Sequence, residues 1–162
     1  MRSTARTTVR REERCGNLAS IRTRFRIFGL NKMDRLFLDA NVLFSSAYKS
    51  DARLLELWNL KNVRLCSSRY ALQEARINLA GEDQKSRLSK LSASLDLFEA
   101  GQTHLPTGLL LPEKDGPIFL AAIEARATHL LTGDVRHFRN YFGKKIERIA
   151  IMRPAEYLRE RK

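Results

Sequence analysis

Apolar and polar positions form blocks along the chain, and these blocks predict strands and helices in alternation. The segment 35–38 has adjacent apolar residues, Phe37 and Leu38, with no polar position between them. This pattern is typical of a strand that is covered on both faces, as in a parallel sheet. Further strands are predicted at 63–66, 128–131 and 146–151.

The segments between these strands have helical spacing. Leu88, Leu91, Leu95 and Phe98 fall on one stripe of a predicted long helix. Asp51, Ser67 and Ser68 are suited to helix N-caps, and Pro117 suits a first helical turn. The predicted helices cover 41–48, 51–58, a segment from Ser67/Ser68 to Leu79, 83–98, 118–127 and 154–158, with a short helix or turn at 135–141 and a loop or short strand in 101–112.

The order of these elements predicts one α/β domain, a three-layer α/β/α sandwich with a central, mostly parallel sheet. A chain of 162 residues can bury a core of that size, and a hydrophobic fraction of 43% excludes wholesale disorder. No apolar run approaches the roughly 18 residues that a membrane-spanning helix needs. We therefore expect no membrane partner.

The segment 1–32 differs from the rest of the chain. It holds nine Arg and Lys against two Glu, a net charge of +7, and it has little periodicity. It could be an RNA-binding arm, an Arg-rich targeting segment or the result of a misassigned start site, with Met33 as the true beginning. We favour a start-site artefact or a disordered extension, and assign the domain to 33–162.

The net charge of +12 narrows the class of partner. A basic surface favours polyanions, chiefly nucleic acid, because it neutralises phosphates, although a merely solvated surface is equally compatible with it. Cys15 and Cys66 are far apart and form no metal-binding spacing. This cysteine usage favours a reduced, cytoplasmic protein.

Four carboxylates are predicted to meet at one edge of the sheet. Asp39 directly follows the strand 35–38, and Asp134 follows the strand 128–131 after a Thr-Gly turn. The carboxyl ends of parallel strands lie at the same edge, and helices that connect such strands begin there. Asp115 and Glu74, each near the start of such a helix, should therefore join them.

Carboxylates gathered in one cleft repel each other unless cations neutralise them. An all-oxygen site suits Mg²⁺ or Mn²⁺ better than Zn²⁺, and the sequence shows no His/Cys cluster to compete. Divalent ions on a basic protein suit phosphodiester hydrolysis, because they can hold the phosphate, activate water and stabilise the leaving oxygen.

Each carboxylate also has a simpler explanation. Asp39 and Asp115 could be helix caps, and Asp134 could shape a turn. Glu74 is chosen over other helical glutamates because it follows its strand at the right distance. Four unrelated roles at one sheet edge explain the pattern less economically than one shared acidic site does.

Other candidate residues carry weaker predictions. Arg136 and Arg139, just past Asp134, could bind phosphate or simply be solvated. His104 and His129 are assigned structural roles. His137 could contact the site or an RNA backbone, but a structural role is preferred.

The motifs together resemble the PIN domain family, closest to the VapC-like toxin ribonucleases of bacteria and their uncharacterised relatives. The resemblance rests on the segments 36–41, 114–122 and 131–138 with Glu74 between them, and it covers 34–160. It implies a compact α/β/α fold and a metal-dependent endoribonuclease. By family position Asp39, Glu74 and Asp115 would be core metal ligands, Asp134 would complete the acidic site, and Asn41 and Thr132 would be supporting polar groups.

We therefore expect an Mg²⁺- or Mn²⁺-dependent endoribonuclease, with the toxin of a type II toxin–antitoxin system as the narrower expectation. Its partners would be an RNA substrate, an antitoxin protein and a second copy in a homodimer. The main alternative is a catalytically inactive PIN-like module that binds RNA or protein. A phosphatase with Asp39 as nucleophile is disfavoured, because position 41 is Asn where a second carboxylate is common.

Overall fold

The structure is a computed structural model, and it describes residues 33–162. The basic segment 1–32 lies outside the described residues, so the expectations for it stay predictions. Among residues 33–162, no helix is both long enough and apolar enough to cross a membrane.

A six-stranded sheet forms the centre of this domain, in the order β3-β2-β1-β4-β6-β5. All neighbouring strands are parallel except β5 and β6, which are antiparallel. The predicted α/β class with a mostly parallel sheet is thus confirmed. The strands are β1 Asp34–Leu38, β2 Val63–Ser68, β3 Asp96–Phe98, β4 His129–Leu131, β5 Lys145–Ile146 and β6 Ile149–Met152.

The strand β1 lies near the middle of the sheet, between β2 and β4. Leu36, Phe37 and Leu38 are completely buried, as are Leu130 and Leu131 of β4. Because helices cover both faces here, consecutive residues are apolar, as the absence of alternation predicted.

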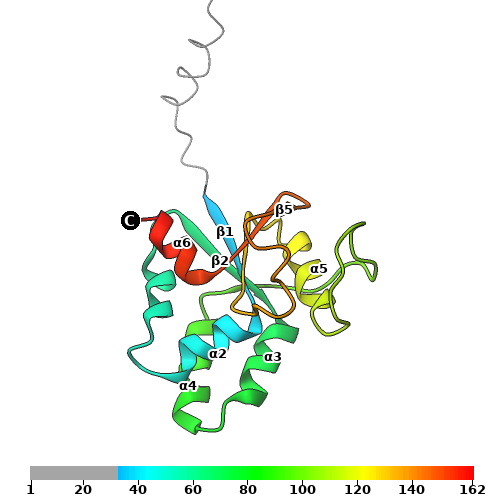
Figure 1. Cartoon of the computed structure of the whole chain (residues 1–162). Helices are drawn as coiled ribbons and strands as arrows, with labels where there is room; N and C mark the ends of the chain where they lie inside the picture. The colour runs from blue at the N-terminus through cyan, green and yellow to red at the C-terminus, as the bar shows by residue number, and fades with distance from the viewer. Residues whose placement is uncertain (1–32) are drawn as a thin grey trace, which may run out of the picture. The chain divides into compact units, whose positions relative to one another are not determined.

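Helices lie on both sides of the sheet and produce the three layers. Figure 1 shows α5 on one side of β1 and β2, and α6 on the other side. The helices α2, α3 and α4 pack against one another near the end of β1, where its chain enters α2 (Figure 1). The helices are α2 Ala40–Tyr48, η1 Arg53–Asn59, α3 Arg69–Asn78, α4 Glu82–Ser92, α5 Gly116–Glu124 and α6 Pro154–Glu160.

Local sequence explains where several helices begin. The Ser68 side chain caps α3 by accepting a hydrogen bond from the Ala71 N–H at 3.0 Å. Pro117 and Pro154 stand in the first turns of α5 and α6, as predicted for Pro117 and for the helix start at Pro154. The helix α5 is buried along most of its length, since it packs on β2, β3 and α3.

The predicted helix 83–98 was too long. The helix α4 ends at Ser92, and Asp96–Phe98 instead form β3, which pairs with the free edge of β2. Trp58 Nε1 donates to the Leu91 carbonyl at 3.2 Å, which satisfies one acceptor at the end of this helix. The stripe that included Leu95 therefore combined a helix with a strand.

Two further predictions need correction. The segment 51–58 forms the 3₁₀ helix η1, which starts after Ala52, and Asp51 does not cap it. The predicted single strand 146–151 is a hairpin of β5 and β6, because Glu147 and Arg148 adopt φ values of 49° and 69° and reverse the chain. The segment 135–141 forms turns, and 101–112 contains no strand.

Candidate functional site

A cleft lies at the carboxyl edge of the sheet where the strand order changes direction. From β1 the chain builds outward to β2 and β3 on one side, and later to β4 and β6 on the other. Crevices at such switch points are the usual ligand sites of open α/β sheets. This cleft has a volume of about 380 Å³ and is lined by Asp39, Ala40, Asn41, Phe44, Glu74, Asn78, Lys114, Asp115 and Asp134.

All four carboxylates predicted from the sequence line this cleft. Asp39 follows β1, Glu74 comes from the middle of α3, Asp115 immediately precedes α5, and Asp134 lies in the turn after β4. The structure brings these residues together, although nothing in it assigns them a catalytic role.

Asp39 is buried and fully engaged by its neighbours. Its Oδ1 accepts a hydrogen bond from the Ala40 N–H, and its Oδ2 accepts one each from Asn41 Nδ2 and Thr132 Oγ1, all at 2.6 Å. The bond to Ala40 makes Asp39 the N-cap of α2. The helix-cap explanation and the cleft position are therefore both true of this residue.

Asn41 and Thr132 join the two strand ends. Asn41 Oδ1 accepts from the Gly133 N–H at 2.7 Å, and Thr132 Oγ1 accepts from the Asp134 N–H at 3.0 Å. A Cβ atom at Gly133 would lie 3.2 Å from Asn41 Oδ1, so a larger residue would crowd this bond. Both residues therefore orient carboxylates of the cleft, and their role as supporting groups of a metal site stays a prediction.

Burial changes the acidity of Asp39. Removal from water raises the pKa of Asp39 from 3.8 to about 6, and the nearby charges of Asp115 and Glu74 raise it further, while the hydrogen bonds from Thr132 and Ala40 act against the shift. The carboxylate is thus held in place by donors but carries its charge at an energetic cost.

Beside the cleft, two of its carboxylates contact His137, a histidine that is not among the lining residues. Nδ1 of His137 lies 2.8 Å from Oδ2 of Asp115 and 2.8 Å from Oδ2 of Asp134. Neither contact has the alignment of a hydrogen bond, so the buried His137 Nδ1 and Asp115 Oδ2 have no hydrogen-bond partner. Such atoms are costly unless something else binds them.

The two carboxylates that contact His137 differ in acidity. Burial raises the pKa of Asp115, although the His137 imidazole lowers it in part. Burial also acts to raise the pKa of Asp134, but hydrogen bonds from the His137 and Arg136 N–H groups outweigh it, and the pKa lies below its ordinary value. Asp134 thus shapes its turn, as the alternative explanation held, whereas Asp115 stands at the N-cap position of α5 without capping it.

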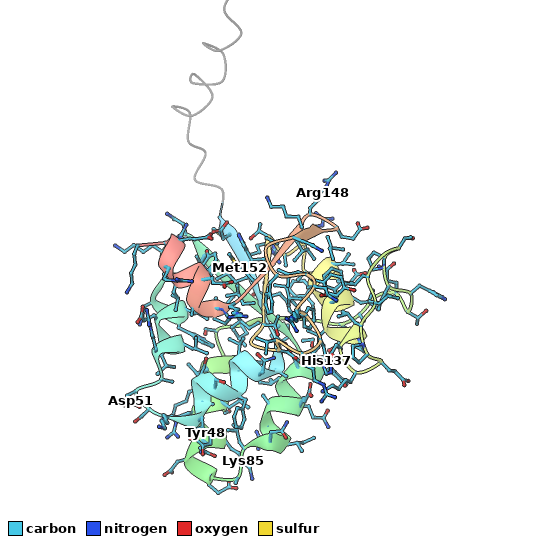
Figure 2. All side chains as sticks on the ribbon, in the orientation of Figure 1. Tyr48, Asp51, Lys85, His137, Arg148 and Met152 are labelled. Atoms are coloured by element: carbon cyan, nitrogen blue, oxygen red, sulfur yellow. The ribbon has the colours of Figure 1, made fainter. Side chains whose placement is uncertain are left out.

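His137 lies closer to the predicted carboxylates than we expected from the sequence. We preferred a structural role for it, yet its ring contacts two of the four predicted carboxylates. Figure 2 shows His137 on the chain that follows β4, beside the region where α3 and the start of α5 meet. Its position three residues after Asp134, within one tight turn, was the available signal.

Other lining residues were not singled out from the sequence. Lys114 adds an exposed positive charge next to Asp115, and Phe44 and Asn78 come from α2 and α3. Arg136 and Arg139 are exposed on the turn past Asp134, and neither lines the cleft. Their phosphate-binding role stays a prediction.

The donor set fits a divalent cation. Ligand atoms of Asp115, Asp134 and His137 all lie within 4.8 Å of one another, and a buried oxygen of Asp115 lacks a hydrogen-bond partner. Carboxylate oxygens are the ligands that hard divalent ions prefer. A cation would bind this oxygen and reduce the repulsion among the four carboxylates.

No family model and no curated protein matches the sequence. The structure is similar to a chain in the crystal structure of VapBC2 from Rickettsia felis bound to a DNA fragment from their promoter. The two are 18% identical with a TM-score of 0.57, over 74% of this chain and 98% of that chain. The chain has a PIN-like fold. At this identity the similarity concerns the fold alone.

Proposed function

We propose that this protein is a divalent-metal-dependent endoribonuclease. The observation that carries the proposal is the convergence of Asp39, Glu74, Asp115 and Asp134 on one cleft at the switch point of the sheet. Such a concentration of negative charge opposes RNA binding unless cations occupy the cleft. A cleft built only for binding a polyanion would have little use for it.

The four carboxylates would hold one or two Mg²⁺ or Mn²⁺ ions. When bound, these ions would activate water, neutralise the scissile phosphate and stabilise the leaving oxygen. Thr132 and Asn41 fix the direction of the Asp39 carboxylate, and the Arg136 and His137 N–H groups fix that of Asp134. These contacts orient the ligands before the substrate arrives, which is how the surrounding residues of a metal site contribute to catalysis.

The remaining cleft residues would receive the substrate. Lys114, exposed beside Asp115, would attract the phosphate backbone, and the net charge of +12 would favour RNA encounter. The choice of RNA follows from the resemblance to PIN ribonucleases. We extend the proposal to a cytoplasmic toxin with an antitoxin partner and a homodimeric state, because the structural neighbour belongs to a VapBC complex.

The test is RNA cleavage by the full chain with Mg²⁺ or Mn²⁺ against the same reaction in EDTA. Asp39→Asn and Asp115→Asn should abolish cleavage without loss of fold, as judged by circular dichroism. The matched control is Asp51→Asn, an exposed aspartate that makes no side-chain contact with the cleft and lies on the opposite side of the view from His137 (Figure 2). Glu74→Gln should also lose cleavage. Its matched control is Glu160→Gln, because Glu160 is an exposed glutamate at the end of α6.

The outcomes separate the proposal from its main alternative. Cleavage that requires metal and fails in both aspartate variants supports an endoribonuclease. RNA binding that persists in EDTA, with no cleavage at any metal concentration, would instead identify a binding module. Cleavage undiminished in Asp39→Asn or Asp115→Asn would overturn the assignment of the site.

A further inference from the structure

His137 occupies a place that an all-carboxylate site does not explain. Its Nδ1 is 2.8 Å from one oxygen of Asp115 and one oxygen of Asp134. A hydrogen bond would let the ring satisfy one of these oxygens, yet Nδ1 is aligned with neither. The Asp115 side chain is 8% exposed, so water does not reach its unpartnered oxygen freely.

We propose that His137 is a nitrogen ligand, through Nδ1, of a divalent ion that it shares with Asp115 and Asp134, and that this cleft therefore prefers Mn²⁺ to Mg²⁺. The inference rests on the metal site of the proposed function. It concerns the ligand set and the identity of the ion, which the four-carboxylate proposal leaves open.

The spacing of the three atoms suits a shared ion. Neighbouring ligands of an octahedral ion with bonds of about 2.1 Å lie roughly 3 Å apart. The two contacts of Nδ1 are 2.8 Å, and all three ligand atoms lie within 4.8 Å of one another. The unaligned geometry that makes poor hydrogen bonds is thus compatible with three atoms directed at a common centre.

The fold holds the ring in this position. Asp134 Oδ1 accepts hydrogen bonds from the N–H groups of Arg136 and His137 at 2.9 and 3.0 Å, which leaves Oδ2 for the His137 ring. The next residue, Phe138, is completely buried and its N–H donates to the Asp134 carbonyl. The turn is therefore anchored on both sides of His137, and the ring has little freedom to leave.

The chemistry of an imidazole ligand discriminates between ions. Mg²⁺ demands oxygen ligands in near-ideal octahedral geometry and retains several waters, so a nitrogen ligand contributes little to its binding. Transition-metal ions bind imidazole more readily than Mg²⁺ does, and Mn²⁺ is a transition-metal ion that also suits carboxylate oxygens. Loss of His137 should therefore weaken Mn²⁺ binding much more than Mg²⁺ binding.

Pulsed electron paramagnetic resonance of Mn²⁺ bound to the full chain tests this directly, without reference to RNA cleavage. Mn²⁺ should show hyperfine coupling to a histidine nitrogen. When histidine is labelled with ¹⁵N, the ¹⁴N coupling should be replaced by a ¹⁵N coupling. The coupling should vanish in His137→Gln and persist in His104→Gln, an exposed loop histidine. The Mn²⁺ dissociation constant should rise at least roughly tenfold in His137→Gln, while Mg²⁺ affinity, measured by competition, should change little.

Three results would overturn the inference in different ways. Tight Mn²⁺ binding that depends on Asp115 but shows no nitrogen coupling would remove His137 from the ligand set and leave the proposed nuclease site intact. Coupling that survives in His137→Gln would place the nitrogen elsewhere. Absence of Mn²⁺ binding in both the wild type and Asp115→Asn would remove the metal site itself and, with it, the proposed function.

Discussion

Two groups of side chains at the candidate site are built differently. We call Asp39, Asn41 and Thr132 the Asp39 wall, and Asp115, Asp134 and His137 the Asp115 wall. In the Asp39 wall the carboxylate accepts three hydrogen bonds. In the Asp115 wall a buried oxygen and a buried nitrogen face each other without one.

The difference follows from how each wall is assembled. β1 and β4 are paired in parallel, with Leu38 opposite Leu131, so Asp39 and Thr132 come next to each other in register. The Asp115 wall joins the loop before α5 to the turn after β4, and no ladder of backbone hydrogen bonds aligns these two segments. We infer that folding alone completes the first wall, whereas a cation completes the second.

The largest expected effect is in Asp115→Asn. RNA cleavage should fall by of the order of a thousandfold, because a metal ion's contribution to the transition state is several kcal/mol. The free energy of unfolding in EDTA, measured by urea denaturation, should not decrease, because the substitution removes a buried charge without a hydrogen-bond partner on one oxygen. Strong destabilisation in EDTA would show that the Asp115 wall is stable without a cation, contrary to the contrast drawn with the Asp39 wall. Asp51→Asn is the control.

The pH dependence of stability should reveal the Asp39 wall. The folded-state pKa of Asp39 is about 6, above its ordinary value of 3.8, so the folded protein binds this proton more tightly than the unfolded chain. The Asp39 contribution therefore lowers the free energy of unfolding by about 3 kcal/mol as pH rises from 3.8 to about 6, and it is constant above that range.

Metal-free urea denaturation across this pH range measures the effect. Asp115 changes stability in the same direction, since its pKa is also raised, and Asp134 in the opposite direction. The contribution of Asp39 is therefore read from the difference between the wild type and Asp39→Asn. This difference should vary between pH 3.8 and 6, and two parallel curves would show that Asp39 has no raised pKa.

A smaller loss of stability is expected in Thr132→Val. The hydroxyl donates to Asp39 Oδ2 and accepts from the Asp134 N–H, so its loss should cost about 1–3 kcal/mol in the free energy of unfolding. Thr107→Val, at an exposed loop position, should have almost no effect. Equal stability of Thr132→Val and wild type would mean that the Asp39 wall does not depend on this bond.

The smallest effect should come from Arg136→Ala and Arg139→Ala. Both side chains are exposed and lie outside the cleft lining, so we expect KM for RNA to rise by a few-fold at low salt with kcat unchanged. Since this contribution is a screened phosphate interaction, it should shrink as salt is added. A fall in kcat would instead connect one of them to the Asp39 wall or the Asp115 wall.

The parts of the site that the sequence predicted are those that depend on strand ends. Asp39, Thr132 and Asp134 each follow a strand whose apolar run is visible, and Asp115 and Glu74 follow from the direction of crossover helices. The contact of His137 with Asp115 joins segments that are 22 positions apart and unrelated by any local pattern. Sequence spacing could not predict that contact.

In the fold, too, local patterns were predicted and long-range contacts were not. The buried strands and most helix starts were predicted, because apolar runs and capping residues act locally. The strand β3 was not, because Leu95 and Phe98 have the spacing of a helix, and pairing with β2 decides their conformation. The β5–β6 hairpin depends on positive φ angles at Glu147 and Arg148, residue types that give no turn signal.

Both edges of the sheet end in very short strands. At one edge β3 has three residues, with Asp96 paired to Arg64 at 3.0 Å. At the other edge β5 has two residues, one of them the exposed Lys145, and the exposed Lys144 and Arg148 lie close to it along the chain. Short, charged edge strands resist the addition of a strand from another molecule. Ordered aggregation by sheet extension is therefore disfavoured at both edges, and association with another chain should use helical surfaces instead.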